Sequence, residues 1–285
     1  MTFSDFESGP PLPKGALNAF PCTLAQQRIW TASKQLGAEA HNIAMRWLVH
    51  GRLPHAVVEE TFNLLVRRHE ILRTSFREVD GNLAQIVWPE PALRVREIDL
   101  VFMSEQEKLA RAEEIARVEA GQPMDLRIAP LLRATVLRFG PDRGALLLTL
   151  HSIVADGWSV GILIREFQAA AAALLNGARP ELPPLDLQFA DYALWEREML
   201  ASGALDESRA YWRRRLRRIS PSEVTPDRGR NGASLRPSQI RSQLLPAALS
   251  QEMEFFAREH GATLYGVAAA ALAATLHRVG GRAQI

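Results

Sequence analysis

The chain has 285 residues, of which 47% are hydrophobic and 23% are charged, and its formal net charge at pH 7 is only +2. This composition is typical of a globular protein of about two domains, and the even charge balance argues against a nucleic-acid-binding protein, whose surface needs clustered basic side chains. The single cysteine, Cys22, excludes a disulfide within the chain and a cysteine-rich zinc site.

The ends of the chain indicate neither secretion nor a membrane. The segment from Met1 to Phe20 is polar and rich in proline and glycine, without the basic start and apolar core of a secretory signal. The longest apolar run, Val267 to Leu276, is about half as long as a membrane span. We therefore expect a soluble, cytoplasmic protein.

Helices and strands alternate in the first part of the chain. Thr23, followed three residues later by Gln26, predicts a capping box and a helix to about Leu36, and a second such pair, Ser104 and Glu107, predicts another helix to about residue 120. Asp80-Gly81 predicts a hairpin turn. Apolar periodicity predicts further helices over 54–69 and 158–175, and strands over 42–50, 72–78, 83–88, 131–139 and 145–150.

The second part is predicted to be mostly helical. Prolines 180, 183 and 184 mark a break after the α-and-β region. Helices are expected over 189–201 and 207–219, and residues 220–238, rich in Ser, Pro, Gly and Arg, are expected to form a linker. A strand over 239–245 and helices over 247–260 and 264–279 complete the prediction.

Six segments, in order, resemble the motifs of one family, the condensation domains of nonribosomal peptide synthetases. Arg68-His69-Glu70-Ile71-Leu72-Arg73-Thr74 is similar to the family's Arg-His-Glu-x-Leu-Arg-Thr, and residues 151–157 are similar to its His-His-x-x-x-Asp-Gly. The other four are 20–30, 124–133, 189–195 with 211–212, and 276–278. Six matches in the family's order are specific, although any one alone is weak.

The resemblance implies an α/β (α+β) fold of two lobes, each like chloramphenicol acetyltransferase, with a tunnel between them. Residues 1–19 would be a leader, 20–178 the complete first lobe, 179–238 a helical connection and linker, and 239–285 the start of a second lobe that in the family runs further. Carrier proteins and neighbouring synthetase domains would be the partners. The carriers' phosphopantetheine arms would deliver a donor thioester and an acceptor amine, with no cofactor bound directly and no metal.

One residue of the motif departs from the family. Ser152 stands where the family has its catalytic histidine, the group that takes or orients the proton of the attacking amine. A serine hydroxyl accepts no proton usefully at pH 7, but it donates and accepts hydrogen bonds and so could position a substrate. Loss of a general base typically costs about 10² to 10⁴ in rate.

The resemblance makes the other motif residues structural. His151 neighbours Ser152 on a predicted strand, where successive side chains point to opposite faces, so His151 is not expected to replace the missing histidine. Asp156 is expected to form a buried ion pair, for which Arg73 is the candidate, and Gly157 is expected to suit a tight turn and a close approach of backbone to substrate.

Several alternatives stay open. The chain is either an acyltransferase impaired or altered at Ser152, or a non-catalytic module that recruits a carrier protein or a tailoring enzyme. A third reading is a related epimerase. Its family has the same two histidines in the motif, so Ser152 would remove one of them there as well. The arginines at 213–215, 217 and 218 are either the solvated face of a helix, which we favour, or an anion-binding patch.

Overall fold

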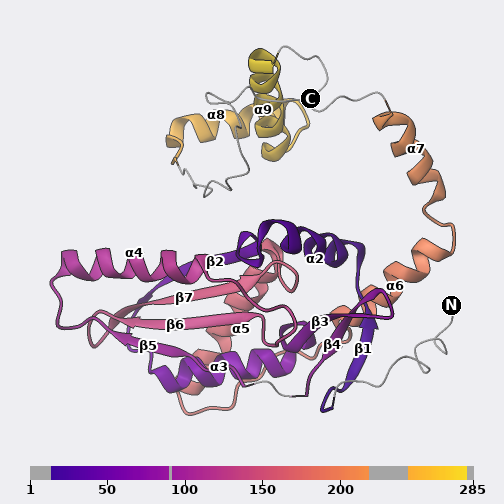
Figure 1. The fold of residues 1–285 in the computed structure, drawn as a ribbon. Helices are drawn as coiled ribbons and strands as arrows, with labels where there is room; N and C mark the ends of the chain where they lie inside the picture. Colours follow the sequence, from indigo (N-terminus) through magenta and orange to yellow (C-terminus); the bar gives the residue numbers. More distant parts are fainter. Residues whose placement is uncertain (1–13, 90–91, 218–242, 281–285) are drawn as a thin grey trace. The chain divides into compact units, whose positions relative to one another are not determined.

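The computed structural model describes residues 14–89, 92–217 and 243–280. The chain divides into two compact units between Ala204 and Leu205, which are described separately (Figure 1). The first unit contains both β-sheets. The second contains, among its described residues, three helices.

The first unit alternates helices and strands over most of its length. Its helices are α2 (Leu24–Leu36), η1 (Ala38–His41), α3 (His55–Arg68), η2 (Glu70–Arg73), α4 (Glu105–Gly121), α5 (Gly157–Leu175) and α6 (Phe189–Ala201), where η denotes a 3₁₀ helix. Its strands are β1 (Asn18–Pro21), β2 (Asn42–His50), β3 (Thr74–Val79), β4 (Asn82–Val87), β5 (Arg96–Asp99), β6 (Leu132–Arg138) and β7 (Arg143–His151).

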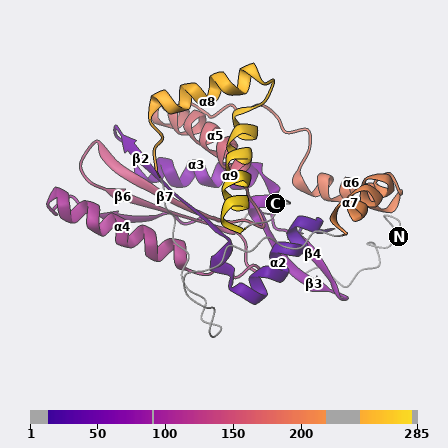
Figure 2. The ribbon, with the colours of Figure 1, turned by 90° about the horizontal axis from the view of Figure 1, so that it is seen from above.

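The strands form two sheets. One has the order β1-β4-β3 and is antiparallel. The other has the order β2-β7-β6-β5, in which only β5 and β6 are parallel. In Figures 1 and 2, helix α4 covers one face of this larger sheet, and α3 and α5 cover the other.

The central strand β7 is buried on both faces because helices cover both. Leu146, Leu148 and Leu150 pack in a cluster with α3 and α5, whereas Ala145 and Leu147 pack in a separate cluster with α4. The alternation follows the two-residue repeat of a strand. Because both faces are covered, the sequence of β7 is almost continuously apolar rather than alternating.

The local predictions for the first unit are largely confirmed. Both capping boxes form, at Thr23 with Gln26 and at Ser104 with Glu107. The hairpin turn is present, with φ of 49° at Asp80 and 78° at Gly81, the left-handed conformation that a tight turn between twisted strands requires. The strands β1 and β5, each of four residues, were not predicted, because segments this short show no clear periodicity.

Helix α5 is long and apolar enough to span a membrane by length and hydropathy alone. Its Leu163, Phe167 and Ala171 are nevertheless buried in the cluster that includes Phe62 of α3, and the ring centroids of Phe62 and Phe167 lie 4.9 Å apart. Leu163, Phe167 and Ala171 form the side of α5 that packs against the core, although only 22% of its apolar stretch is buried.

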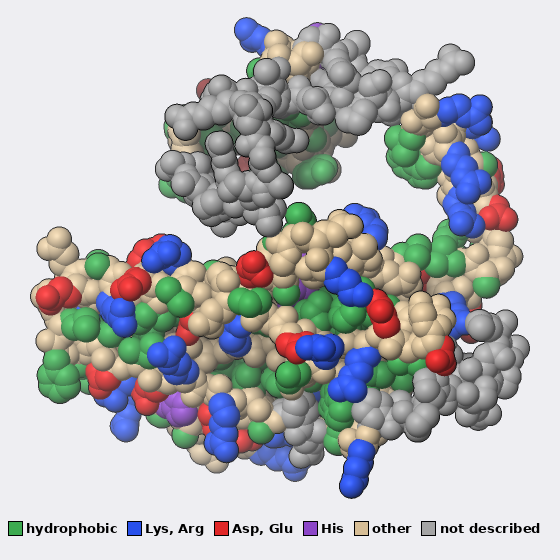
Figure 3. Space-filling view, in the orientation of Figure 1, with side chains coloured by type: hydrophobic (Ala, Val, Ile, Leu, Met, Phe, Trp, Pro, Cys, Tyr) green, Lys and Arg blue, Asp and Glu red, His purple; other side chains and the backbone are tan. Residues whose placement is uncertain are grey.

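The second unit comprises α7 (Asp206–Leu216), α8 (Ala247–Glu259) and α9 (Leu264–Gly280). Of its described residues, only Ala257 belongs to the buried apolar set. The arginines at 213–215 and 217 are exposed, as are Trp212 and Leu216, so the described part of α7 has no buried apolar side opposite its arginines. Figure 3 shows Lys and Arg side chains in blue over α7. Arg218 lies outside the described residues. The predicted linker at 220–238 and residues 239–242 of the predicted strand also lie outside them, and residues 243–246 are not in a strand.

Candidate active site

His151 ends strand β7 and is completely buried, with 0% of its surface exposed. Its Nδ1 accepts a hydrogen bond from the backbone N–H of Ile153 at 3.2 Å. Burial, helped by the nearby His41, lowers the pKa of His151 from 6.5 to about 4, and an opposing contribution comes from the Ala38 backbone. The ring is therefore neutral at pH 7 and out of reach of a substrate.

Ser152 follows directly and is only partly buried. Its backbone N–H donates to the carbonyl oxygen of His41 at 2.8 Å, and its Oγ lies 3.4 Å from Nδ1 of the same histidine. The strand pairing explains this contact. Asn42 of β2 pairs with His151 of β7, so one further step along both chains sets His41 opposite Ser152. Side chains of directly opposed residues lie on the same face of a sheet and interact.

His41 was not predicted as a functional residue, because it lies 111 residues from Ser152 in the sequence. It ends η1, and its ring centroid is 5.9 Å from that of His151. Its Nε2 is buried and has no hydrogen-bond partner among the described residues. The only signal in the sequence was its place immediately before the predicted strand at 42–50, and using it would have required knowing which strand pairs with the motif.

The predicted ion pair between Asp156 and Arg73 is wrong. Asp156 is exposed and caps helix α5: its Oδ1 accepts from the backbone N–H of Ser159 at 2.8 Å and from the Ser159 hydroxyl at 2.7 Å. These hydrogen bonds lower the pKa of the Asp156 carboxyl. The free N–H groups of a helix start offer a carboxylate a local partner, which here takes the place of a distant arginine.

Arg73 instead stabilises the end of the hairpin. Its Nη1 donates to the carbonyl oxygens of Trp88 and Pro89 at 2.8 and 2.9 Å, and its Nη2 donates to Glu70 Oε1 at 3.0 Å. Gly157 is the first residue of α5 and does not have a positive φ, so the backbone there does not require a glycine. A Cβ built on it would contact nothing within 4 Å, and its close approach to substrate stays a prediction.

The motif segment Arg68-His69-Glu70 joins three helices. His69 Nε2 and Arg68 Nε contact the Glu166 carboxylate of α5 at 2.6 and 3.2 Å. Gln188, which caps α6, donates to the Arg68 carbonyl at 3.1 Å and accepts from the Glu70 N–H at 3.0 Å. These contacts give the segment a packing role.

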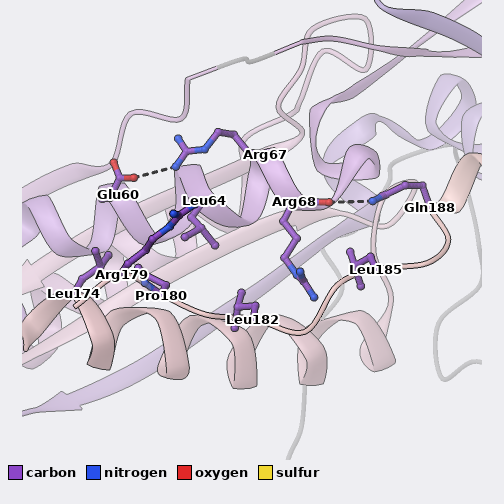
Figure 4. A pocket seen from close by; sticks show the side chains of 10 residues that line it. All are labelled: Glu60, Leu64, Arg67, Arg68, Leu174, Arg179, Pro180, Leu182, Leu185 and Gln188. Carbon is purple, nitrogen blue, oxygen red and sulfur yellow. Dashed lines mark hydrogen bonds and ion pairs between the residues drawn. The ribbon is translucent and has the colours of Figure 1, made fainter. Parts of the chain in front are cut away.

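A cavity of about 750 Å³ lies beside this junction. In Figure 4 the side chains of Leu64 and Leu182 flank it, and the salt bridge between Arg67 and Glu60 lies at one side. Its lining includes neither His41 nor any residue of the motif at 151–157.

Within residues 14–89, 92–217 and 243–280, a second reactive centre could come from a metal-binding cluster or from the single cysteine. Among the residues that the structure describes, no cluster of three or more His, Cys, Asp or Glu side chains could hold a metal ion. Cys22 is buried, and burial raises the pKa of its thiol to about 12, which keeps it protonated and unreactive at neutral pH.

The family model described as Condensation domain matches residues 17–285. The chain belongs to the condensation-domain family of nonribosomal peptide synthetases. The resemblance inferred from the six motifs is thereby confirmed.

The curated relatives are multidomain synthetases. The chain is 34% identical over 267 residues to one component of the linear gramicidin synthase of Brevibacillus parabrevis, covering 93% of this chain and 3% of that protein. It is 34% identical over 263 residues to the phosphinothricin tripeptide synthetase PhsC of Streptomyces viridochromogenes, covering 92% of this chain and 24% of that protein. A third relative, CymA of Salinispora arenicola, is described as a probable non-canonical nonribosomal peptide synthetase. It is 35% identical over 272 residues, covering 91% of this chain and 3% of that protein. The chain thus spans a small part of each.

Solved condensation-type domains share the fold. The first condensation domain of the calcium-dependent antibiotic synthetase, in complex with a substrate analogue, matches with a TM-score of 0.79 and 24% identity, over 93% of this chain and 62% of that one. The X-domain from teicoplanin biosynthesis, solved in complex with OxyB, matches with a TM-score of 0.75 and 27% identity, over 96% of this chain and 61% of that one. The predicted fold class, mixed α and β and like chloramphenicol acetyltransferase, is confirmed.

Proposed function

We propose that this domain forms an amide bond between two carrier-bound substrates. Because its site carries Ser152, the rate of this reaction is lower than in relatives that have a histidine at this position. The donor is an acyl or peptidyl thioester and the acceptor an amine, each held on the phosphopantetheine arm of a carrier protein. The partners in this proposal are those carriers and the neighbouring synthetase domains, in the cytoplasm. Residues 20–178 would form the first lobe and 239–285 the start of the second.

The different exposure of the two neighbouring motif residues carries the proposal. His151 is fully buried, whereas Ser152 is partly exposed. The position that the family uses for proton transfer is therefore the more accessible of the two, which supports the proposal. A serine there keeps hydrogen-bonding capacity while losing direct basicity.

The expected rate follows from what is kept and what is lost. Loss of a general base costs about 10² to 10⁴ in rate. Holding the amine and the thioester in an attacking geometry contributes separately and does not depend on the side chain at position 152. The proposal therefore predicts measurable but slow condensation.

The test is a condensation assay with the full-length protein. Donor-loaded and acceptor-loaded carrier proteins are mixed with it, and the acceptor carrier is followed by intact mass. We expect a condensed product, formed at least about tenfold faster by the Ser152→His variant. A Ser202→His variant, which introduces a histidine at an exposed serine of the first unit, should leave the rate unchanged. No product from either the unaltered protein or Ser152→His would contradict the proposal.

A second candidate is a non-catalytic recruiting module. The likeness to the teicoplanin X-domain, solved bound to OxyB, favours it, because that structure is of a complex between a domain of this fold and a partner protein. The same assay separates the two candidates. A recruiting module would bind a carrier or a tailoring enzyme but give no condensed product even with Ser152→His.

A further inference from the structure

We propose that His41 acts with Ser152 as a proton relay, through which this site recovers the base that its motif has lost. The inference rests on the proposed function, since it names the group that would make the slow condensation possible. His41 is then a positioning residue that acts through Ser152 rather than by touching the substrate.

The first support is geometric. Ser152 Oγ and His41 Nδ1 are 3.4 Å apart, a distance at which a hydroxyl and an imidazole interact and from which catalytic hydrogen bonds commonly tighten when substrate binds. The backbone hydrogen bond of 2.8 Å from Ser152 to the His41 carbonyl holds the two residues in register. The backbone therefore keeps the two residues side by side, and the conformations of the two side chains bring Oγ and Nδ1 to 3.4 Å.

The second support is that the His41 ring, apart from its contact with His151, has only the hydrogen bond to Ser152 in the described structure. Its Nε2 is buried without a hydrogen-bond partner among the described residues, and Ser152 provides the hydrogen bond found for Nδ1. A buried polar atom without a partner is costly and often marks a site with a function. By contrast, His69 Nε2 contacts the Glu166 carboxylate at 2.6 Å, between helices α3 and α5.

The third support is the neutrality of the neighbouring ring. His151, 5.9 Å away, has a pKa of about 4 and carries no charge at pH 7. It therefore does not repel a proton arriving on His41. An imidazole can accept such a proton near neutral pH, which a serine hydroxyl alone cannot.

The relay balances as follows. The amine nitrogen attacks the thioester carbon, a C–N bond forms, and the C–S bond breaks. The proton lost by the amine passes to Ser152 Oγ while the hydroxyl proton of Ser152 passes to His41 Nδ1, whose ring carries its other proton on Nε2. The proton on His41 returns by the same route to the departing thiolate, so that the products are an amide and a free thiol.

The test is a set of variants in the condensation assay, with kcat and KM measured separately. His41→Asn places an amide where Nδ1 stands, so it can keep the hydrogen bond to Ser152 but cannot take a proton. We expect His41→Asn and Ser152→Ala each to lower kcat about 10- to 100-fold with little change in KM. The double variant should be no slower than the slower single variant, because residues that act as one unit are not additive.

Two further variants separate a relay from a merely structural role. Ser152→His supplies the base directly, so Ser152→His with His41→Asn should be as fast as Ser152→His alone. His50→Gln, at the exposed far end of β2, the strand that follows His41, should have no effect. Thermal melts of each variant check that the fold is retained.

The outcomes are distinguishable. Unchanged kcat in His41→Asn, or an equal loss when His41→Asn is added to Ser152→His, would overturn the relay and leave the proposed condensation standing. Product from Ser152→His but none from the unaltered protein would overturn the relay together with the proposed slow condensation by the unaltered protein. No product from any variant would reject the proposed condensation and the relay together.

Discussion

At the scale of single residues, the motif separates two neighbours into opposite environments. His151 is fully buried at the end of β7, and Ser152 is partly exposed beside His41. The buried imidazole is held neutral because desolvation disfavours its charged form. This neutrality links the stability of the domain to pH.

The stability of the domain should fall between neutral pH and pH 5 partly because of His151. Its pKa is about 4 in the folded protein and about 6.5 when unfolded, so between these values the unfolded state binds more protons. The contribution of His151 is complete above pH 6.5 and is lost as pH falls towards 4, by about 2 kcal/mol at pH 5. Urea unfolding at pH 7.5 and pH 5 measures it. His151→Gln should lose less stability between the two than the unaltered protein, and equal losses would contradict the assignment.

At the scale of elements, hydrogen bonds at the N-terminus of helix α5 hold the loop that carries the motif. Helix α5 begins at Gly157 with Asp156 and Ser159 in a capping box, as α4 begins with Ser104 and Glu107. The loop between β7 and α5 is therefore fixed locally. Arg73, in a different element, holds the β3–β4 hairpin through the Trp88 and Pro89 carbonyls.

Removing the cap should have a moderate cost that does not depend on Arg73. Asp156→Ala is expected to lower the free energy of unfolding by about 1 kcal/mol, because it removes one N-cap, and Ser104→Ala in α4 provides a matched control of similar size. Arg73→Ala should cost about 1 kcal/mol, because it removes hydrogen bonds to a part-buried carbonyl at Trp88 and an exposed one at Pro89. In the double variant Asp156→Ala with Arg73→Ala, the two losses should add within about 0.5 kcal/mol. Chemical denaturation of all four variants measures these free energies of unfolding. A coupling energy well above about 0.5 kcal/mol would show that Asp156 and Arg73 interact after all.

At the scale of the whole molecule, the apolar core is distributed unevenly. All three clusters of buried apolar side chains lie within residues 22–171. Helix α6 is anchored to the same unit, since Glu196 accepts a hydrogen bond from the Leu24 N–H at 2.8 Å and Ala190 and Ala193 are buried. The described residues after Ala204 bury little apolar surface in the chain as it stands.

A fragment of residues 14–204 should therefore fold by itself. We expect a cooperative thermal transition by circular dichroism, because the fragment keeps every buried cluster. A fragment of residues 14–178 should melt at a lower temperature, since it loses α6 and the Gln188 contacts to Arg68 and Glu70. A fragment of residues 205–285 should show no cooperative transition. Equal melting temperatures for the two longer fragments would show that α6 adds nothing to the first unit.

The sequence by itself determined the features that depend on neighbouring residues. Two capping boxes, a hairpin turn and most helices and strands follow from patterns within a few residues, where local hydrogen bonds and side-chain periodicity decide the conformation. The order of six motifs was sufficient to indicate the family. The short strands β1 and β5 were not predicted, because each is defined by its pairing with a longer strand and not by a pattern in its own residues.

Only the tertiary structure decided which distant residues meet. The Asp156 carboxylate satisfied the nearest free N–H groups rather than an arginine 83 positions earlier in the sequence. The contact between His41 and Ser152 arises from the register of β2 against β7, which one sequence does not reveal. A pairing between strands far apart in the chain depends on how the whole core packs, and so the environment of the motif became visible only in the folded protein.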